Sequence, residues 1–192
     1  MKRLLIQNIG LLATPAGHEA RRGPAQGEIS MTKNAWLLAE DGVITASGTG
    51  VPPGCGTAQV LDAQGCLVTP GLVDAHTHLI FGGWRQNELG LKLHGVSYLE
   101  ILARGGGILS TVEATRAASE AALVQKALPE LETMLRWGTT TCEIKSGYGL
   151  ATEQELKQLR AIRRLQPLQP VELVPTFMGA HAVPAEQQPS GD

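Results

Sequence analysis

From about residue 67 onward, short apolar segments alternate with longer segments of helical periodicity. The apolar segments cover residues 67–75, 139–144 and 171–177. Helices are predicted over residues 119–137 and 153–165, where apolar residues recur three and four positions apart. Strands that alternate with helices of this length favour parallel βα units, so this region is predicted to adopt an α/β fold.

Residues 1–66 show a different pattern, made of short strands and turns. Asp41-Gly42 separates two apolar runs, and this dipeptide favours a two-residue hairpin because both turn positions need positive φ. The sequence therefore predicts two parts. A small β domain covers residues 1–66, and an α/β domain that begins with a buried strand covers residues 67–192.

Two predicted helix starts carry the capping-box pattern, in which a hydroxyl and a carboxylate three residues apart satisfy free N–H groups. The pairs are Ser110 with Glu113 and Thr152 with Glu155. Pro175 lies within the segment 171–177 and argues against a simple central strand there. The apolar face of the last helix is predicted to consist of Leu156, Leu159 and Ile162.

The charge pattern and composition exclude several classes of protein. Sixteen Lys and Arg residues against eighteen Asp and Glu give a net charge of −2. Without a basic tract we expect no nucleic-acid partner, and without an apolar run of about 18 residues we expect no membrane span and no signal peptide. The three cysteines have no Cys-x-x-Cys spacing, which favours a reducing, cytoplasmic location. They are Cys55, Cys66 and Cys142.

The sharpest chemical signal is His76-Thr77-His78, which directly follows an apolar strand. Residues two apart on a strand point to the same side, so the two imidazoles are expected to face one point. That point lies at the carboxyl end of a parallel strand, where α/β barrels place their active sites. Imidazole is a good ligand for Zn²⁺ and for Fe²⁺. Two histidines without a metal are the alternative interpretation of such a pair.

The stretch Thr69-Pro-Gly-Leu-Val-Asp-Ala-His-Thr-His-Leu79 resembles the first metal-binding strand of the amidohydrolase superfamily. Those enzymes are (β/α)8 barrels with a small flanking β domain. The resemblance implies that residues 67–192 form about the first three βα units of an incomplete (β/α)8 TIM barrel. It also implies that residues 1–66 form part of a small β-sandwich domain.

Four further motifs resemble the imidazolonepropionase family, whose members hydrolyse a cyclic amide in the third step of histidine degradation. They cover residues 81–88, 105–112, 143–150 and 176–182. By this resemblance, His76 and His78 match metal ligands and Arg85 matches the arginine that binds the propionate of the substrate. Tyr148 matches a tyrosine that contacts the substrate. His181 matches a histidine that contacts the substrate and helps to polarise its carbonyl.

The implied reaction is the hydrolysis of 4-imidazolone-5-propanoate to N-formimidoyl-L-glutamate by a water that one divalent metal, Zn or Fe, activates. The resemblance also implies a small-molecule substrate and a homodimer when the protein is full length. A fork-shaped guanidinium at Arg85 suits a carboxylate better than lysine would.

The length limits what these 192 residues are expected to do alone. A complete barrel needs about 250 residues, and a catalytic zinc site usually takes three protein ligands, of which this sequence offers two clear ones. We therefore expect the isolated chain to be inactive and to bind metal weakly. The alternatives are another amidohydrolase, such as a heterocycle deaminase or a different cyclic-amide hydrolase, and a non-catalytic fragment or half of a split enzyme.

Overall fold

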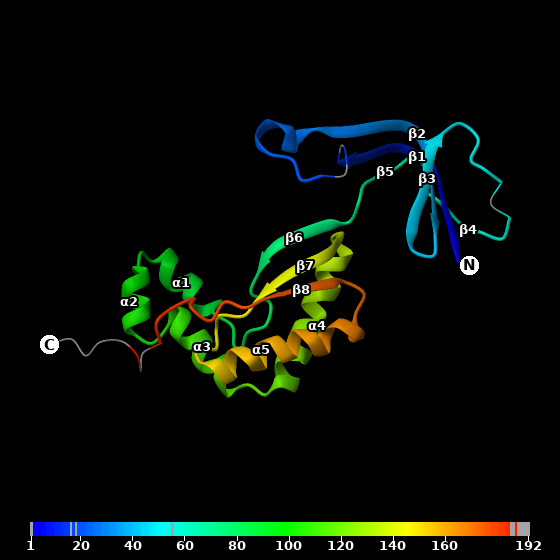
Figure 1. Cartoon of the computed structure of the whole chain (residues 1–192). Helices are drawn as coiled ribbons and strands as arrows, with labels where there is room; N and C mark the ends of the chain where they lie inside the picture. Colours follow the sequence, from blue (N-terminus) through cyan, green and yellow to red (C-terminus); the bar gives the residue numbers. More distant parts are fainter. Residues whose placement is uncertain (1, 16, 18, 55, 185–186, 188–192) are drawn as a thin grey trace. The chain divides into compact units, whose positions relative to one another are not determined.

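The computed structural model describes residues 2–15, 17, 19–54, 56–184 and 187, so the predicted loop thiol of Cys55 lies outside the described residues. The chain divides into two compact units, Met1–Pro70 and Gly71–Asp192, and each is described by itself. Figure 1 shows both units with the labels used below. No helix of the described residues is long and apolar enough to cross a membrane.

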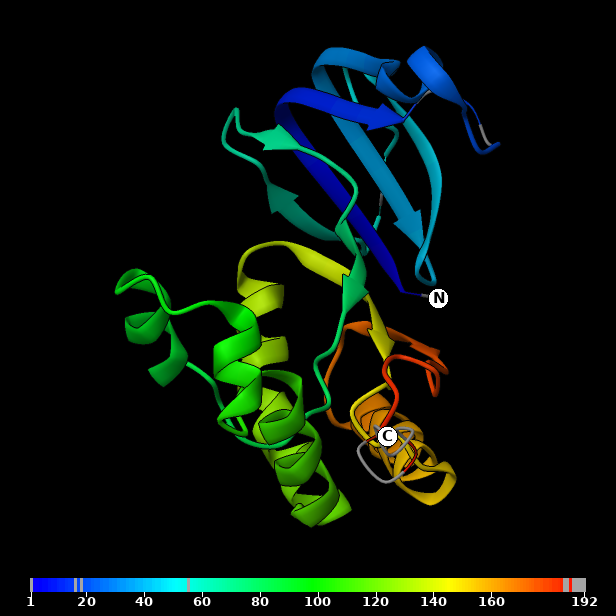
Figure 2. The ribbon, with the colours of Figure 1, turned by 90° about the vertical axis from the view of Figure 1, so that its left-hand side faces the viewer.

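The first unit is built around a five-stranded mixed sheet in the order β3-β2-β1-β4, with β5 also paired to β1 (Figure 2). β1 and β2 are antiparallel, whereas β4 and β5 run parallel to β1. A small core of Ile9, Leu12, Ala35 and Leu37 lies against this sheet. The elements are β1 (Arg3–Pro15), η1 (Gly23–Gly27), β2 (Ile29–Glu40), β3 (Val43–Thr49), β4 (Gln59–Asp62) and β5 (Leu67–Val68).

The predicted Asp41-Gly42 hairpin is present between β2 and β3. Asp41 has φ +48° and Gly42 has φ +86°, the positive values that a type I′ turn requires. The Asp41 carboxylate also accepts a hydrogen bond from the backbone N–H of Lys2 at 2.7 Å, which holds the turn beside the start of β1.

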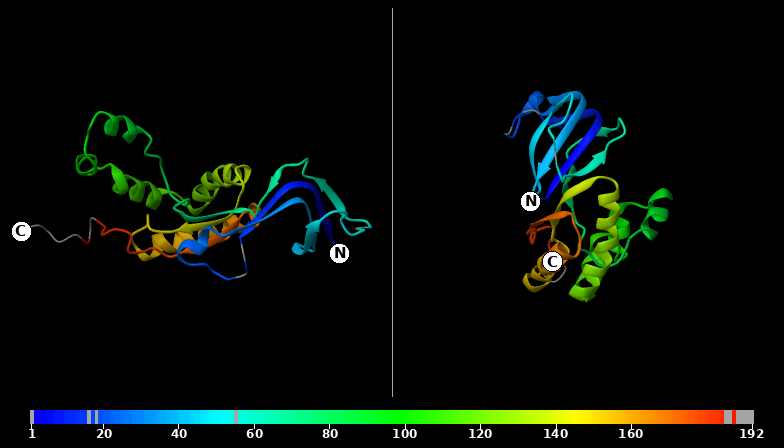
Figure 3. Two further views of the ribbon diagram at one scale, coloured as in Figure 1. Left: turned by 90° about the horizontal axis from the view of Figure 1, so that it is seen from above. Right: turned by 90° about the vertical axis from the view of Figure 1, so that its right-hand side faces the viewer.

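The second unit contains a parallel sheet in the order β6-β7-β8, with helices between successive strands. Figures 1 and 3 show α1 and α2 beyond the carboxyl ends of these strands. The parallel βα units predicted from the sequence are therefore present. The elements are β6 (Leu72–Thr77), α1 (Asn87–Leu93), α2 (Tyr98–Ala103), α3 (Gly107–Ala117), α4 (Glu120–Arg136), β7 (Thr139–Lys145), α5 (Thr152–Leu165), η2 (Gln166–Leu168) and β8 (Glu172–Thr176).

The core of the second unit lies between the sheet and the helices α4 and α5. On β7, Cys142 and Ile144 are fully buried in this core together with Leu131 of α4 and Ile162 of α5. Because side chains alternate along a strand, the polar residues Glu143 and Lys145 face the other side of the sheet. One face of the strand is thus apolar and packed on helices, and the other is polar.

The predicted buried strand over residues 67–75 is wrong in two respects. Leu67–Val68 forms β5 and pairs with β1, so these residues belong to the first sheet. In β6, the side chains of Leu72 and Val73 are 56% and 66% exposed.

Both predicted capping boxes are also wrong. Ser110 lies inside α3, which begins at Gly107, and its hydroxyl donates to the Gly107 carbonyl at 3.0 Å. The N-cap of α5 is Ala151, and no side chain caps that helix.

The predicted apolar face of α5 is wrong in part. Leu156 is 38% exposed, whereas Glu155 and Gln158 are buried on the same side of the helix as Ile162. Pro175 lies in β8, opposite Ile144, at an edge of the described sheet, where proline is tolerated.

Candidate functional site

Three loops follow the carboxyl ends of β6, β7 and β8, and they carry the predicted site residues. His76 is in β6 and His78 lies just beyond it. Tyr148 lies three residues beyond β7, and His181 lies five residues beyond β8. Because the strands are parallel, these loops meet at one edge of the sheet.

The aromatic rings of these residues form a cluster centred on His78. The His78 and His181 rings stack, with centroids 4.7 Å apart and an interplanar angle of 12°. The Tyr148 centroid lies 5.0 Å from that of His78 and 5.4 Å from that of His181. The His76 and His78 rings meet edge to face at 5.9 Å. The structure therefore brings together four of the five predicted site residues.

His78 has a buried ring nitrogen that lacks a partner among the described residues. Its Nδ1 atom makes no hydrogen bond and is shielded from solvent. Burial lowers the pKa of His78, and the positive charges of His181, His76 and Lys145 lower it further, against a hydrogen bond to the Ser146 backbone that raises it. The imidazole is thus biased towards its neutral form, which is the form that binds a metal ion.

The neighbours of these histidines on β6 and β7 have local partners. Asp74 accepts a hydrogen bond from the backbone N–H of His76 at 3.2 Å. Burial raises the pKa of Glu143, but hydrogen bonds from Lys145, Thr176 and the Thr77 backbone, together with the charge of Lys145, give a net downward shift. The Lys145 ammonium forms an ion pair with the Glu143 carboxylate.

The segment of residues 147–150, called the 147–150 loop below, is held by two side chains of α5. The Glu155 carboxylate accepts hydrogen bonds from the N–H groups of Gly147, Gly149 and Leu150 at 2.7–2.8 Å. Gln158 Oε1 accepts from the N–H of Tyr148 at 3.3 Å. Every N–H group of the loop is therefore satisfied by this helix.

The loops after β7 and β8 are also joined to each other. Ser146 is fully buried, its N–H donates to the Thr176 carbonyl at 2.9 Å, and its hydroxyl accepts from the Met178 N–H at 2.9 Å. His181 Nδ1 lies 2.9 Å from the Gly147 carbonyl. Since a carbonyl can only accept, Nδ1 carries the hydrogen of this bond.

Arg85, the fifth predicted site residue, pairs with Glu88 and is not part of the ring cluster. Its Nη1 atom lies 3.8 Å from a carboxylate oxygen of Glu88, within ion-pair range but too long for a hydrogen bond. The buried Glu88 carboxylate also accepts from the Gly107 N–H at 2.6 Å. Glu88 thus anchors the glycine-rich start of α3 and lies beside the guanidinium.

A half-buried lysine, whose ammonium nitrogen is shielded from solvent, lies against the aromatic residues that precede Arg85. Lys126 Nζ lies 3.0 Å from the centroid of Phe81 and 3.9 Å from that of Trp84. It makes no hydrogen bond within the described residues. Burial lowers the pKa of Lys126 to about 8, although Glu130 opposes this shift. Phe81 in turn meets Tyr148 edge to face at 6.3 Å, so this group borders the ring cluster.

Sequence reasoning missed the residues behind the loops, namely Glu88, Lys126, Glu155 and Gln158. A signal for two of them was present. Glu155 and Gln158 stand three residues apart and continue the spacing of Ile162 and Leu165, which marks them as part of the inward face of α5. Polar residues at such positions need internal partners when they are buried.

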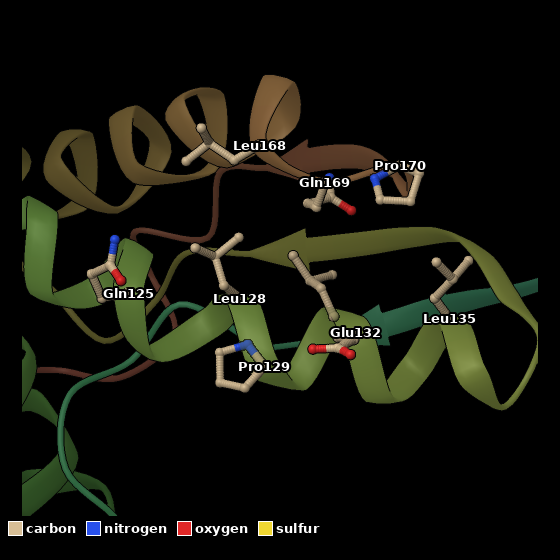
Figure 4. A pocket seen from close by; sticks show the side chains of 9 residues that line it. Gln125, Leu128, Pro129, Glu132, Leu135, Leu168, Gln169 and Pro170 are labelled. Carbon is tan, nitrogen blue, oxygen red and sulfur yellow. The ribbon is translucent and has the colours of Figure 1, made fainter.

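A separate groove lies near the amino ends of β7 and β8, away from the histidines. Figure 4 shows it between α4 and the segment 168–170. It has a volume of about 410 Å³, and Leu128, Leu135 and Leu168 line it. Among the described residues, no group of three metal-ligating side chains lies in this groove.

Comparisons with known proteins give consistent results. The amidohydrolase family matches residues 59–103. Imidazolonepropionase of Bacillus velezensis is 51% identical over 189 residues, which are 98% of this chain and 45% of that protein. Imidazolonepropionase of Caldanaerobacter subterraneus is 50% identical over 183 residues, which are 95% of this chain and 44% of that protein. The chain thus spans less than half the length of the curated relatives it matches.

Solved structures show a shared fold at low sequence identity. Escherichia coli guanine deaminase aligns with a TM-score of 0.63 and 14% identity, over 93% of this chain and 36% of that one. Atrazine chlorohydrolase of Arthrobacter aurescens, complexed with zinc, aligns with a TM-score of 0.53 and 17% identity, over 91% of this chain and 35% of that one. The α/β fold is therefore that of the amidohydrolases.

Proposed function

This chain belongs by its sequence with the imidazolonepropionases of the amidohydrolase family, and on that premise we propose that it supplies the substrate-binding part of such an enzyme. The reaction is the hydrolysis of the cyclic amide of 4-imidazolone-5-propanoate to N-formimidoyl-L-glutamate. The observation that carries the proposal is the convergence of three loops at the carboxyl ends of parallel strands, with His78, Tyr148 and His181 in ring contact.

The donor chemistry of His76 and His78 fits one divalent metal ion, Zn or Fe. The buried Nδ1 of His78 has no partner among the described residues, and the downward pKa shift of this residue favours the neutral ligand form. When bound, such an ion supplies a Lewis acid and lowers the pKa of water. Within the described residues no third His, Cys, Asp or Glu joins these two histidines.

Arg85 is proposed to bind the propionate of the substrate. Its guanidinium is about one-third exposed, and Glu88 lies beside it without a hydrogen bond, so its N–H donors are open to a carboxylate. A bidentate contact fixes the direction of the propionate and thereby the placement of the ring carbonyl.

Tyr148 and His181 are proposed to contact the imidazolone ring. Both border His78, and the 147–150 loop and the loop after β8 are tied to each other through the hydrogen bond of His181 to the Gly147 carbonyl. Fixed donors and dipoles near the reacting carbonyl stabilise the negative charge that develops on its oxygen. In this role His181 polarises the carbonyl, and Tyr148 orients the ring.

We further propose that residues 67–192 are the first three βα units of a (β/α)8 barrel and that residues 1–66 are part of a small β sandwich. The polar face of β7, opposite the helices, is the kind of surface that lines the inside of a barrel near its active site. An apolar groove of about 470 Å³ beside β8, which includes Leu173, Pro175 and Phe177, offers packing surface for a further unit.

The test is hydrolysis of 4-imidazolone-5-propanoate by the complete natural polypeptide, supplied with Zn²⁺ or Fe²⁺. Arg85→Ala is expected to raise KM about 10- to 100-fold, because a hydrogen-bonded charge contributes about 1.5–3 kcal/mol. Arg136→Ala is the matched control, since Arg136 only pairs with Glu132 on the exposed side of α4.

Three outcomes contradict the proposal. Absence of hydrolysis in the metal-supplied protein contradicts the activity, and deamination of a heterocyclic base in its place supports a different amidohydrolase. An unchanged KM in Arg85→Ala contradicts a carboxylate-bearing substrate at this arginine.

We also propose that the 192-residue chain alone hydrolyses this substrate at no measurable rate. Two histidines are fewer than the three protein ligands that a catalytic zinc site usually takes. Turnover by a purified chain of verified length would contradict this expectation and would require a further ligand.

A further inference from the structure

Glu155 is a buried carboxylate whose hydrogen bonds leave its own helix. Its side chain is 1% exposed. Oε2 accepts from the Gly147 N–H at 2.8 Å, and Oε1 accepts from the N–H groups of Gly149 and Leu150 at 2.7 Å. The capping-box pattern of the sequence would direct this carboxylate to a backbone N–H at the start of its own helix. With Ala151 as the N-cap, Glu155 is the fourth helical residue, and its carboxylate binds the 147–150 loop instead.

The backbone of this loop depends on that carboxylate. Gly147 has φ +112° and Leu150 has φ +52°, a conformation that is uncommon for a residue such as leucine. The loop thus curls around the carboxylate, with the N–H groups of Gly147, Gly149 and Leu150 pointing towards it. Such backbone concavities bind anions, and in this protein the anion is a side chain of the protein itself.

Gln158, one turn further along α5, connects this arrangement to the histidine strand. It is fully buried, accepts from the Tyr148 N–H at 3.3 Å and donates to the Ile80 carbonyl at 2.6 Å. Ile80 lies two residues after His78. The same helix face therefore holds the loops after both β6 and β7.

Gly147 links Glu155 to His181 through two adjoining peptide groups. Its N–H is bound by Glu155, and its carbonyl is bound by His181 Nδ1 at 2.9 Å. A Cβ atom at Gly147 would lie 2.9 Å from that same nitrogen, so the ring and the peptide are in close contact. A change in the backbone torsions of Gly147, which join these two peptide groups, would therefore move His181 and the neighbouring Tyr148 together.

We infer that Glu155 is a positioning residue, which sets the places of Tyr148 and His181 through its three hydrogen bonds to the 147–150 loop. The inference rests on the proposed function, because these two side chains are there assigned to substrate contact. Glu155 itself touches no substrate in this account.

Glu155→Gln replaces the carboxylate oxygen Oε2, which binds the Gly147 N–H, and leaves the other oxygen in place. The amide keeps one oxygen for Gly149 and Leu150 but places an NH₂ group against the Gly147 N–H, where two donors meet. In the complete natural polypeptide, kcat/KM is expected to fall 10- to 100-fold, with KM raised at least threefold, while the metal content per chain stays at the wild-type value. A purely structural loss would reduce the amount of folded enzyme and so lower apparent kcat, but it would leave KM unchanged.

Two further variants complete the design. Glu153→Gln removes a carboxylate from the exposed side of the same helix turn and is expected to leave both constants unchanged. Glu155→Asp retains the charge and both oxygens and is expected to recover part of the lost kcat/KM. This variant decides the question where Glu155→Gln does not fold, and a wild-type KM in folded Glu155→Asp would overturn the inference.

A double-mutant cycle tests whether Glu155 acts through Tyr148. The fold decrease in kcat/KM of the double variant Glu155→Gln, Tyr148→Phe is expected to be smaller than the product of the two single decreases. Glu155→Gln already displaces Tyr148, so removing the hydroxyl of that residue costs less in this background. Fully multiplicative losses would overturn the inference.

Amide hydrogen exchange separates failure of this inference from failure of the proposed function. Glu155→Gln is expected to speed exchange at Gly147 relative to Glu153→Gln, whatever substrate the protein hydrolyses. If the wild-type protein does not hydrolyse the imidazolone, the proposed function fails and the exchange result still decides whether Glu155 holds the loop. Unchanged exchange at Gly147 would overturn the inference.

Discussion

A methyl group at Gly82 would test the close approach between the loop after β6 and the backbone of α3. A Cβ atom there would lie 2.3 Å from the Ala114 carbonyl oxygen and 2.4 Å from its carbon. Non-bonded carbon atoms are at their optimum about 3.5–4.0 Å apart, so the loop would have to move by about 1 Å. The movement would also break the hydrogen bond from the buried Gly82 N–H to Thr115 Oγ1, which is 2.9 Å long.

We expect Gly82→Ala to lower the free energy of unfolding by about 2–4 kcal/mol. Overpacking of a close contact costs about 1–3 kcal/mol, and the loss of one hydrogen bond costs about 1 kcal/mol more. Since Arg85 lies three residues further along the same loop, the displacement is also expected to raise KM for the proposed substrate about 10- to 100-fold in the complete natural polypeptide. Urea unfolding followed by circular dichroism gives the first quantity, and steady-state kinetics gives the second.

Gly90→Ala is the matched control with the opposite expected sign. Gly90 is exposed within α1, and a Cβ atom there would meet nothing within 4 Å. Alanine in the middle of a helix is more favourable than glycine by about 0.5–1 kcal/mol. Equal urea midpoints for Gly82→Ala and the wild-type protein would refute the close approach, and so would equal destabilisation by the two variants.

Three further changes test other parts of the second unit. Lys157→Met should lower the free energy of unfolding by about 1–3 kcal/mol in urea titrations, because Lys157 Nζ donates 2.9 Å hydrogen bonds to three carbonyls at the end of α3. Lys126→Met should change the pH dependence of stability. The folded protein releases the Lys126 proton above about pH 8, whereas the unfolded chain releases it only near pH 10.5. Between these values the unfolded state binds more protons, so the free energy of unfolding of the wild-type protein should rise with pH. In the variant this rise should be smaller. His78→Ala should lower the zinc or iron content per chain, measured by atomic emission, with the circular dichroism spectrum unchanged.

Each of these expectations has a result that contradicts it. Equal urea unfolding midpoints for Lys157→Met and wild type would mean that water hydrogen-bonds to the carbonyls at the end of α3 as well as Lys157 does. An unchanged slope of stability against pH in Lys126→Met would mean that the Phe81 and Trp84 rings keep the ammonium charged in the folded state. Wild-type metal content in His78→Ala would remove this residue from the proposed metal site.

The sequence predicted those features that depend on local chemistry. Asp41-Gly42 specifies its hairpin because positive φ at two successive residues suits few other pairs. The alternation of apolar segments and helices likewise predicted the parallel units. The order of the described strands places the loops that carry His78, Tyr148 and His181 at one edge, and this follows from parallel topology once the strands are known.

The features that escaped prediction depend on tertiary contacts. Thr152 and Glu155 have the spacing of a capping box. The Glu155 carboxylate instead accepts hydrogen bonds from three N–H groups of the 147–150 loop, which have no other partner within the described residues. Leu67 follows the pattern of a barrel strand and yet pairs with β1, since the choice between two sheets depends on long-range partners. Arg85 could be assigned a role by resemblance, but its neighbour Glu88 could not.

Glycine-rich loops beside a site are often cradles for phosphate, because their N–H groups can converge on an anion. In this protein the N–H groups of Gly107, Gly147 and Gly149 already bind the carboxylates of Glu88 and Glu155. A phosphorylated ligand would have to displace a buried carboxylate to use them, which leaves a charge without a partner. These three N–H groups are therefore occupied by carboxylates of the protein itself and offer no ready site for a phosphate.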